Sequence, residues 1–192
     1  MVKSGFVNVI LNLLNEQCYL AKKNKLFTMN IAYLILGGNK GDKLKNLQVA
    51  IEQLEKKAGR VLKKSDIYVT AAWGNTDQPD FFNQVVCLQT ELSAHELLNQ
   101  LLKIEEESGR IRDAQKWMER TLDIDILFFN DSIIKTDNLT IPHPYIQDRK
   151  FVLIPMAEVA PEFMHPELNK NIKTLLDECK DELEVKKKQQ TF

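Results

Sequence analysis

The sequence has little of what marks the special classes of protein. Its 192 residues include three cysteines, seven glycines and six prolines, which argues against a disulfide framework, a collagen-like chain and a low-complexity chain. The 26 lysine and arginine residues nearly balance the 27 aspartate and glutamate residues, so no overall field favours nucleic acid or a membrane surface. Any anion-binding site must therefore be a local cluster of charges. The cysteines are odd in number and far apart, which predicts a cytoplasmic protein.

The first 28 residues stand apart from the rest of the sequence. Their apolar run at 6–14 is broken by asparagines and is shorter than the roughly 20 residues that span a membrane. Met29 directly precedes a strand-like run, so an over-long gene start is one interpretation and a docked amphipathic helix is another. We predict an appendage at 1–28, one domain at 29–180 and a polar tail at 181–192, with Lys186 to Gln190 in solvent.

From residue 31 the pattern alternates between strands and helices. Apolar, β-branched runs predict strands at 31–36, 61–70, 81–90 and 122–129. Helical spacing predicts a helix from Leu44 to a stop at Gly59, and another from a Ser93–Glu96 capping box to Gly109. The order β-α-β-β-α-β predicts an α+β, ferredoxin-like antiparallel sheet with both helices on one face and the other face free for a site.

Further C-terminal elements follow this core. Short edge strands are expected at 133–134 and 139–141, and a short last helix at 172–179. A helix at 148–159 contains Pro155, which predicts an early stop or a kink there.

Two acidic residues carry the first chemical signal. Asp123 and Asp125 are two apart in a predicted strand, so their carboxylates share one face while Ile124 points to the other. Unpaired carboxylates so close repel each other, and Mg²⁺ held by one or two carboxylates with substrate phosphates would remove that conflict. The alternative is a pair of acids on a wet surface.

A cluster of cations precedes the acids. Arg110, Arg112, Lys116 and Arg120 lie within eleven positions, and arginine forks match phosphate oxygens. Cations beside a carboxylate pair are the groups that phosphoryl transfer needs. Trp117 within this stretch either stacks on a ligand ring or anchors the loop by packing.

A polar loop at 71–80 carries the second signal, with Thr70 and Trp73 at its start. Phe81 and Asn83 follow it on one strand face, where an aromatic ring and a carboxamide suit a flat heterocycle. Plain core packing is the alternative for Phe81.

The segment Gly37–Asn39 ends a strand before a helix but lacks the spacing of a phosphate-binding loop. A turn that shapes a pocket is the better interpretation. His143, between two prolines, either contacts phosphate or holds a structural turn.

Together these residues resemble the 6-hydroxymethyl-7,8-dihydropterin pyrophosphokinase family, in order and spacing from about residue 31 to 161. The most specific piece is the RTLDID string at 120–125. Met118 and Glu119 depart from a common Gly-Pro, Ala71 from a common proline, and Trp73 from a common leucine. The other matching pieces are Gly37–Asn39, Gln78–Asn83, Ile104–Glu105, Gly109–Arg112, Trp117, Pro142–Pro144 and Arg149–Leu153.

The resemblance implies transfer of the β,γ-pyrophosphoryl group of ATP to the hydroxymethyl oxygen of a reduced pterin, with release of AMP. We also expect a monomer, with no nucleic acid and no membrane among its partners. The resemblance further implies two Mg²⁺ ions on Asp123 and Asp125, and charge stabilisation by Arg112 and Arg120. No general base is assigned, although Asp125 is a candidate. The implied ATP site comprises Arg110, Arg112, Trp117, Arg120, His143, Tyr145 and Arg149, and the implied pterin pocket Thr70, Trp73, Phe81, Asn83 and Phe151.

Two other functions compete with this interpretation. One is a different metal-dependent, nucleotide-transferring enzyme that uses the same acids, and the other is a non-catalytic ferredoxin-like module that binds a small ligand. Product analysis distinguishes the first, and Mg²⁺-independent binding would favour the second.

Overall fold

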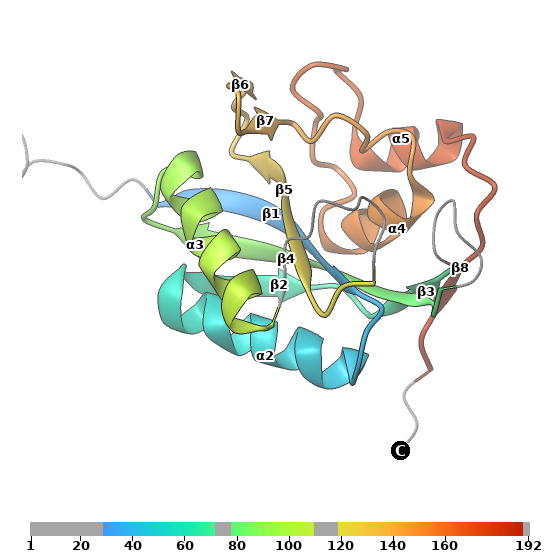
Figure 1. Ribbon diagram of the computed structural model, residues 1–192. Helices are drawn as coiled ribbons and strands as arrows, with labels where there is room; N and C mark the ends of the chain where they lie inside the picture. The colour runs from blue at the N-terminus through green and yellow to red at the C-terminus, as the bar shows by residue number, and fades with distance from the viewer. Residues whose placement is uncertain (1–28, 72–77, 110–118, 190–192) are drawn as a thin grey trace, which may run out of the picture.

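The computed structural model describes residues 29–71, 78–109 and 119–189, and an antiparallel sheet lies at its centre (Figure 1). The strand order is β5-β1-β4-β3-β8, with β2 also paired to β4. The core order confirms the predicted ferredoxin-like α+β fold. The strands are β1 (Asn30–Gly38), β2 (Arg60–Lys64), β3 (Tyr68–Thr70), β4 (Phe81–Thr90), β5 (Asp123–Phe129) and β8 (Val185–Lys187).

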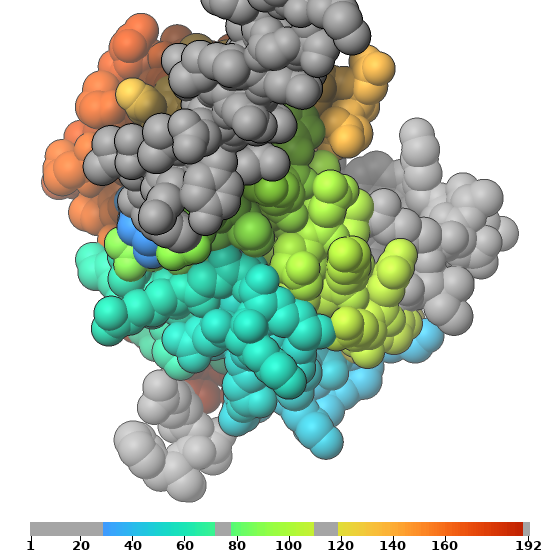
Figure 2. Space-filling model, turned by 90° about the vertical axis from the view of Figure 1, so that its left-hand side faces the viewer, coloured from blue at the N-terminus to red at the C-terminus, as the bar shows by residue number. Residues whose placement is uncertain are grey.

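Two helices, α2 (Lys43–Lys57) and α3 (Ala94–Glu107), cover one face of the sheet and lie side by side in Figures 1 and 2. Both begin at the predicted places: the Asp42 side chain caps α2, and Ser93 and Glu96 form the capping box of α3. The first hydrophobic core lies between these helices and the sheet. Alternate residues of β1, among them Leu34 and Leu36, point into it.

The other face of the sheet is covered by α4 (Lys150–Val159) and α5 (Ile172–Glu178), which enclose a second core. The expectation of a free second face is therefore wrong over this part of the sheet. Of the early stop or kink expected at Pro155, the stop is also wrong, because α4 runs on to Val159. Burial of the α4 side chains Val152, Met156 and Val159 in the second core offsets the cost of about 3 kcal/mol for a proline inside a helix.

The strand predicted at 61–70 is divided into β2 and β3 by Ser65. Its hydroxyl accepts the backbone N–H of Val85 at 3.0 Å, while its own N–H donates to the Val85 carbonyl at 2.8 Å. The side chain thus replaces a backbone partner, and the register with β4 moves by one residue between Lys64 and Tyr68. Sequence periodicity alone does not show such a break.

Two short strands, β6 (Ile134–Lys135) and β7 (Thr140–Ile141), pair with each other outside the main sheet. Lys186 and Lys187 are exposed, as the predicted solvated tail requires, but the expectation of a tail is wrong for them, because they belong to β8 and pair with β3. This strand shows no alternation of buried and exposed residues, because Val185 is partly buried and both lysines are exposed. Within the described residues, no helix has the length and apolar character needed to cross a membrane.

Candidate active site at one end of the sheet

The two carboxylates lie at the start of β5. Asp123 is half-buried and Asp125 is exposed, while Ile124 and Ile126 are buried in the first core. The acids therefore share one face, as the strand period predicts. On the opposite face, the buried Glu105 of α3 accepts the Ile124 N–H at 2.8 Å and so holds this edge strand in place.

Arg120 joins the acid pair to the end of β1. Its Nη1 forms an ion pair with Oδ2 of Asp123. Its backbone N–H donates to Oδ1 of Asn39 at 2.9 Å, and its carbonyl accepts the Asn39 N–H at 3.0 Å. Gly38 permits this close approach, since a Cβ there would lie 2.4 Å from the Thr121 carbonyl oxygen.

Asn39 has a larger role than the pocket-shaping turn predicted from the sequence. The residue is only 2% exposed. Besides accepting from Arg120, its amide nitrogen lies 3.2 Å from Oε1 of Gln78 and 3.3 Å from the Pro79 carbonyl oxygen, and donates to both. One buried carboxamide thus connects the end of β1 to the segments that lead into β4 and β5. The sequence signal was an asparagine directly after a glycine pair at a strand end.

A second polar pair lies across β1 from the acids. Asn83 and Thr70 are buried, and Nδ2 of Asn83 donates to Oγ1 of Thr70 at 2.9 Å. Oδ1 of Asn83 lies over Gly37, where a Cβ would be 2.9 Å away. Phe81 lies on the same strand face as Asn83 and is half-buried; within the described residues neither core includes it, which weakens the core interpretation of its ring.

The strand registers place these two pairs on one face. Gly37 opposes Asp123 on one side and Asn83 on the other, and Asn83 in turn opposes Tyr68. Residues directly opposite in an antiparallel pair project from the same face. The acids and the Asn83–Thr70 pair are therefore neighbours across one glycine.

His143 lies between the acid pair and α4. Its backbone N–H donates to the carbonyl of Leu127 at 3.0 Å, and Leu127 is the extra residue of a bulge in β5. Burial and the guanidinium of Arg149 lower the His143 pKa to about 4, although the Asp123 carboxylate acts in the opposite direction. The imidazole is therefore neutral near pH 7, with an acid and an arginine both close enough to influence it.

Arg149 links the predicted ATP and pterin residues. Its guanidinium carbon lies 4.9 Å from the ring centroid of Tyr145 and 5.7 Å from that of Phe151. Arg149 is the N-cap residue of α4 and Phe151 lies in its first turn, so the start of this helix presents both side chains. Tyr145 is 54% exposed, so this residue is available to a ligand.

The donor set fits a magnesium ion that arrives with a polyphosphate. Within the described ranges, no three histidine, cysteine, aspartate or glutamate side chains gather as a metal site. Two carboxylates on one face nevertheless suffice for Mg²⁺, which takes its other ligands from phosphates and water. The ion pair of Arg120 with Asp123 shows that this place attracts positive charge.

The described site thus brings together ten of the predicted site residues. The other four, Trp73, Arg110, Arg112 and Trp117, lie outside the described residues. So does the predicted appendage at 1–28. The residues brought to this end of the sheet are Thr70, Phe81, Asn83, Arg120, Asp123, Asp125, His143, Tyr145, Arg149 and Phe151.

The fold and this site define a ferredoxin-like α+β domain with paired acids, an arginine and a buried carboxamide at one end of its sheet. Comparison with known proteins identifies the family of this domain. Residues 33–161 match the family described as 7,8-dihydro-6-hydroxymethylpterin-pyrophosphokinase (HPPK), which is more than half of the chain. This protein belongs to that family.

Named relatives agree with the match. The chain is 46% identical over 144 residues to a 2-amino-4-hydroxy-6-hydroxymethyldihydropteridine pyrophosphokinase of Synechocystis sp., covering 74% of this chain and 73% of the relative. It is 39% identical over 145 residues to the protein of the same name from Aquifex aeolicus, and this match covers 76% of this chain and 89% of that relative.

A solved structure supports the fold. The crystal structure of Plasmodium falciparum HPPK-DHPS with STZ-DHP aligns with a TM-score of 0.64 at 21% identity and covers 79% of this chain. This chain spans 43% of that longer chain, so the likeness concerns the shared fold alone.

Proposed function

We propose that this protein transfers the pyrophosphoryl group of ATP to 6-hydroxymethyl-7,8-dihydropterin, giving the pterin diphosphate and AMP, in folate biosynthesis. Family membership over residues 33–161 carries the proposal. It favours this activity over the two alternatives left open by the sequence, a different nucleotide-transferring enzyme and a non-catalytic binding module. ATP is the co-substrate.

The acid pair and its arginine would hold the triphosphate. Asp123 and Asp125 would bind Mg²⁺, two ions by the family resemblance, and the bound metal would offset charge on the attacking and leaving oxygens. Arg120 is already anchored to Asp123 and to Asn39. Its guanidinium can therefore stabilise charge on the transferred group without a large loss of side-chain freedom. A similar role for Arg112 stays a prediction.

The neutral His143 and the exposed Tyr145 would line the ATP site with Arg149. A histidine that is uncharged near pH 7 contributes a hydrogen bond to phosphate or ribose rather than a positive charge. The charge at this side of the site therefore comes from Arg149, which also lies over the Phe151 ring.

The pterin would occupy the space beside Asn83 and Thr70, with its ring between Phe81 and Phe151. The carboxamide of Asn83 is fixed by Thr70 at 2.9 Å and by the lack of a side chain at Gly37. A fixed carboxamide offers both a donor and an acceptor to a heterocycle edge. Because Gly37 separates Asn83 from Asp123, the two substrates would meet above this residue.

In the reaction, the hydroxymethyl oxygen attacks the β-phosphorus in line. The bond from the β-phosphorus to the α,β-bridging oxygen breaks, and AMP leaves with that oxygen. The hydroxyl proton is lost at the attack, and Asp125, exposed on the site face, is the candidate acceptor.

We further propose that the enzyme acts as a cytoplasmic monomer, without nucleic acid or a membrane. The charge balance of the chain gives no overall field for nucleic acid or a membrane surface, and Cys87 and Cys179 are free thiols, which suits a reducing compartment.

Product analysis tests the proposed activity. Purified protein, ATP, MgCl₂ and the reduced hydroxymethylpterin should give AMP and pterin diphosphate in equal amounts. Free pyrophosphate with a nucleotidylated pterin would instead show a nucleotidyltransferase. Binding of the pterin without turnover of ATP would show a non-catalytic module.

A further inference from the structure

The segment after α5 lies outside the family match at 33–161, yet it contacts both sides of the proposed pterin pocket. Residues 181–187 run from a half-buried aspartate to the edge strand β8. In Figure 1 this segment passes from α5 along α4 to β3. Its contacts fall into two groups, one at the start of α4 and one along β3.

At the first contact, Asp181 caps α4 from a distance. The N-cap residue Arg149 makes no side-chain cap hydrogen bond of its own. Instead, Oδ2 of Asp181 accepts the backbone N–H of Lys150 at 2.9 Å, while Oδ1 accepts the N–H of Leu183 at 3.0 Å. A carboxylate there also faces the positive end of the helix dipole. The capped turn is the one that presents Arg149 and Phe151 to the site.

At the second contact, β8 supports the strand that carries Thr70. Val185 opposes Thr70 and Lys186 opposes Val69. The N–H of Lys188 donates to the Ile67 carbonyl at 2.8 Å, which makes Lys186 and Val69 the next hydrogen-bonded pair of the ladder. Without β8, the three-residue β3 would be an unsupported edge, and Thr70 holds the carboxamide of Asn83.

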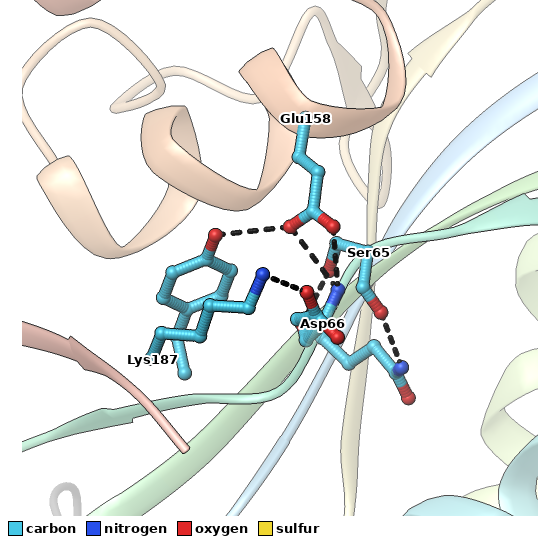
Figure 3. A network of polar contacts seen from close by, with 6 residues as sticks. Ser65, Asp66, Glu158 and Lys187 are labelled. Atoms are coloured by element: carbon cyan, nitrogen blue, oxygen red, sulfur yellow. Dashed lines mark hydrogen bonds and ion pairs between the residues drawn. The ribbon is translucent and has the colours of Figure 1, made fainter. Parts of the chain in front are cut away.

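A polar network connects β8 to β3 and to the last turn of α4 (Figure 3). Lys187 forms an ion pair with Asp66. The Asp66 N–H donates to the two carboxylate oxygens of Glu158, at 3.1 and 3.2 Å. The Tyr68 hydroxyl donates to Glu158 at 2.9 Å. Since Glu158 is on α4 and Tyr68 on β3, the strand β8 is connected to both elements.

We propose that residues 181–187 form a strap that positions the two walls of the pterin pocket. Asp181 fixes Phe151 through the first turn of α4, and β8 fixes Thr70, and with it Asn83, through β3. These are positioning residues, because they touch α4 and β3 rather than the substrate. The inference rests on the proposed function, since it assigns Phe151 and Thr70 to the pterin.

Asp181→Ala tests the first contact in the full-length protein. Loss of a helix cap changes an equilibrium by about fivefold, so we expect the KM for the pterin to rise about fivefold. The KM for ATP should rise as well, because Arg149 belongs to the same turn. Asp181→Asn keeps one acceptor oxygen and should recover at least half of the loss. Ser93→Ala is the matched control, because it removes the cap of α3 at the other end of β4.

Lys186→Pro tests the second contact, since proline removes the N–H of the middle residue of β8. We expect a rise in the KM for the pterin of about fivefold, with the KM for ATP within twofold of wild type. Lys186→Ala is the control, because it removes only the exposed pair with Glu184 and leaves the strand intact. Thermal unfolding of each variant shows whether the comparison is made between folded proteins.

The outcomes separate the strap from the proposed function. A wild-type protein that forms no AMP from ATP and the pterin would refute the proposed function. The strap is refuted if the wild type is active but neither test variant raises the KM for the pterin above that of its control. The comparisons are Asp181→Ala against Ser93→Ala and Lys186→Pro against Lys186→Ala. If Asp181→Ala does not fold, Lys186→Pro decides: a pterin KM above that of Lys186→Ala supports the strap, and an equal KM contradicts it.

Discussion

Gly37 offers a sharp test of the site geometry, because a single added methyl group reaches one functional atom. In Gly37→Ala the new Cβ would lie 2.9 Å from Oδ1 of Asn83, against 3.4 Å or more for an ordinary contact. The carboxamide is the end of a side chain and can move, but it is buried and bonded to Thr70 at 2.9 Å. A shift of roughly half an ångström would weaken that bond.

The free-energy cost follows from these contacts. A lost internal hydrogen bond costs about 1 kcal/mol, and more if a buried polar group is left without a partner. Replacing glycine also lowers the conformational entropy of the unfolded chain, which stabilises the folded protein by about 0.5 kcal/mol. The free energy of unfolding should therefore fall by about 1 kcal/mol or less. The pterin, which would bind the displaced carboxamide directly, should bind 5- to 30-fold more weakly, as for a loss of about 1–2 kcal/mol.

The assay is a pair of steady-state titrations, one in the pterin and one in ATP, with urea unfolding of the same samples. We expect the KM for the pterin to rise and that for ATP to stay within twofold. A double-mutant cycle with Asn83→Ala adds a check, because Gly37→Ala should cost nothing further once the carboxamide is gone. Equal losses for both substrates, or a full additional loss in the double variant, would refute this placement of Asn83.

Three further changes test other parts of the site. Asp123→Ala should abolish turnover through loss of the metal, and retention of a tenth of the activity would contradict that role. Phe81→Ala should weaken pterin binding while ATP binding survives; an unfolded variant would instead make Phe81 a core residue. In the folded state the His143 pKa is about 4, below the unfolded value of about 6.5. The unfolded chain therefore binds the extra proton, and stability falls as pH drops from about 6.5 towards 4. Urea unfolding at pH 7 and pH 5 measures this effect. Between these two pH values, the free energy of unfolding should fall by about 2 kcal/mol less in His143→Gln than in wild type. Equal falls would mean that His143 is not buried in neutral form.

Local sequence patterns predicted the core of the fold. The alternation at 122–129 correctly placed Asp123 and Asp125 on one face and Ile124 in the core. The Ser93–Glu96 pattern located the start of α3. These features depend on neighbours along the chain, so periodicity and capping rules capture them.

Long-range contacts were not predictable in the same way. The break at Ser65 depends on its bonds to Val85, and the start of α4 depends on Asp181, which is 31 positions further along. The hydrogen bonds of the Asn39 side chain likewise connect three loops. A single sequence carries the polar residues for such contacts but no signal of their partners.

The proposed chemistry requires that Asp123 and Asp125 hold a divalent cation together with the nucleotide. Electron paramagnetic resonance of Mn²⁺, titrated with and without a non-hydrolysable ATP analogue, measures this directly. We expect tight binding of Mn²⁺ to the protein only when the analogue is present, and loss of the protein-bound ion in Asp125→Asn at unchanged thermal stability. Equal Mn²⁺ binding by wild type and Asp125→Asn in the presence of the analogue would contradict it.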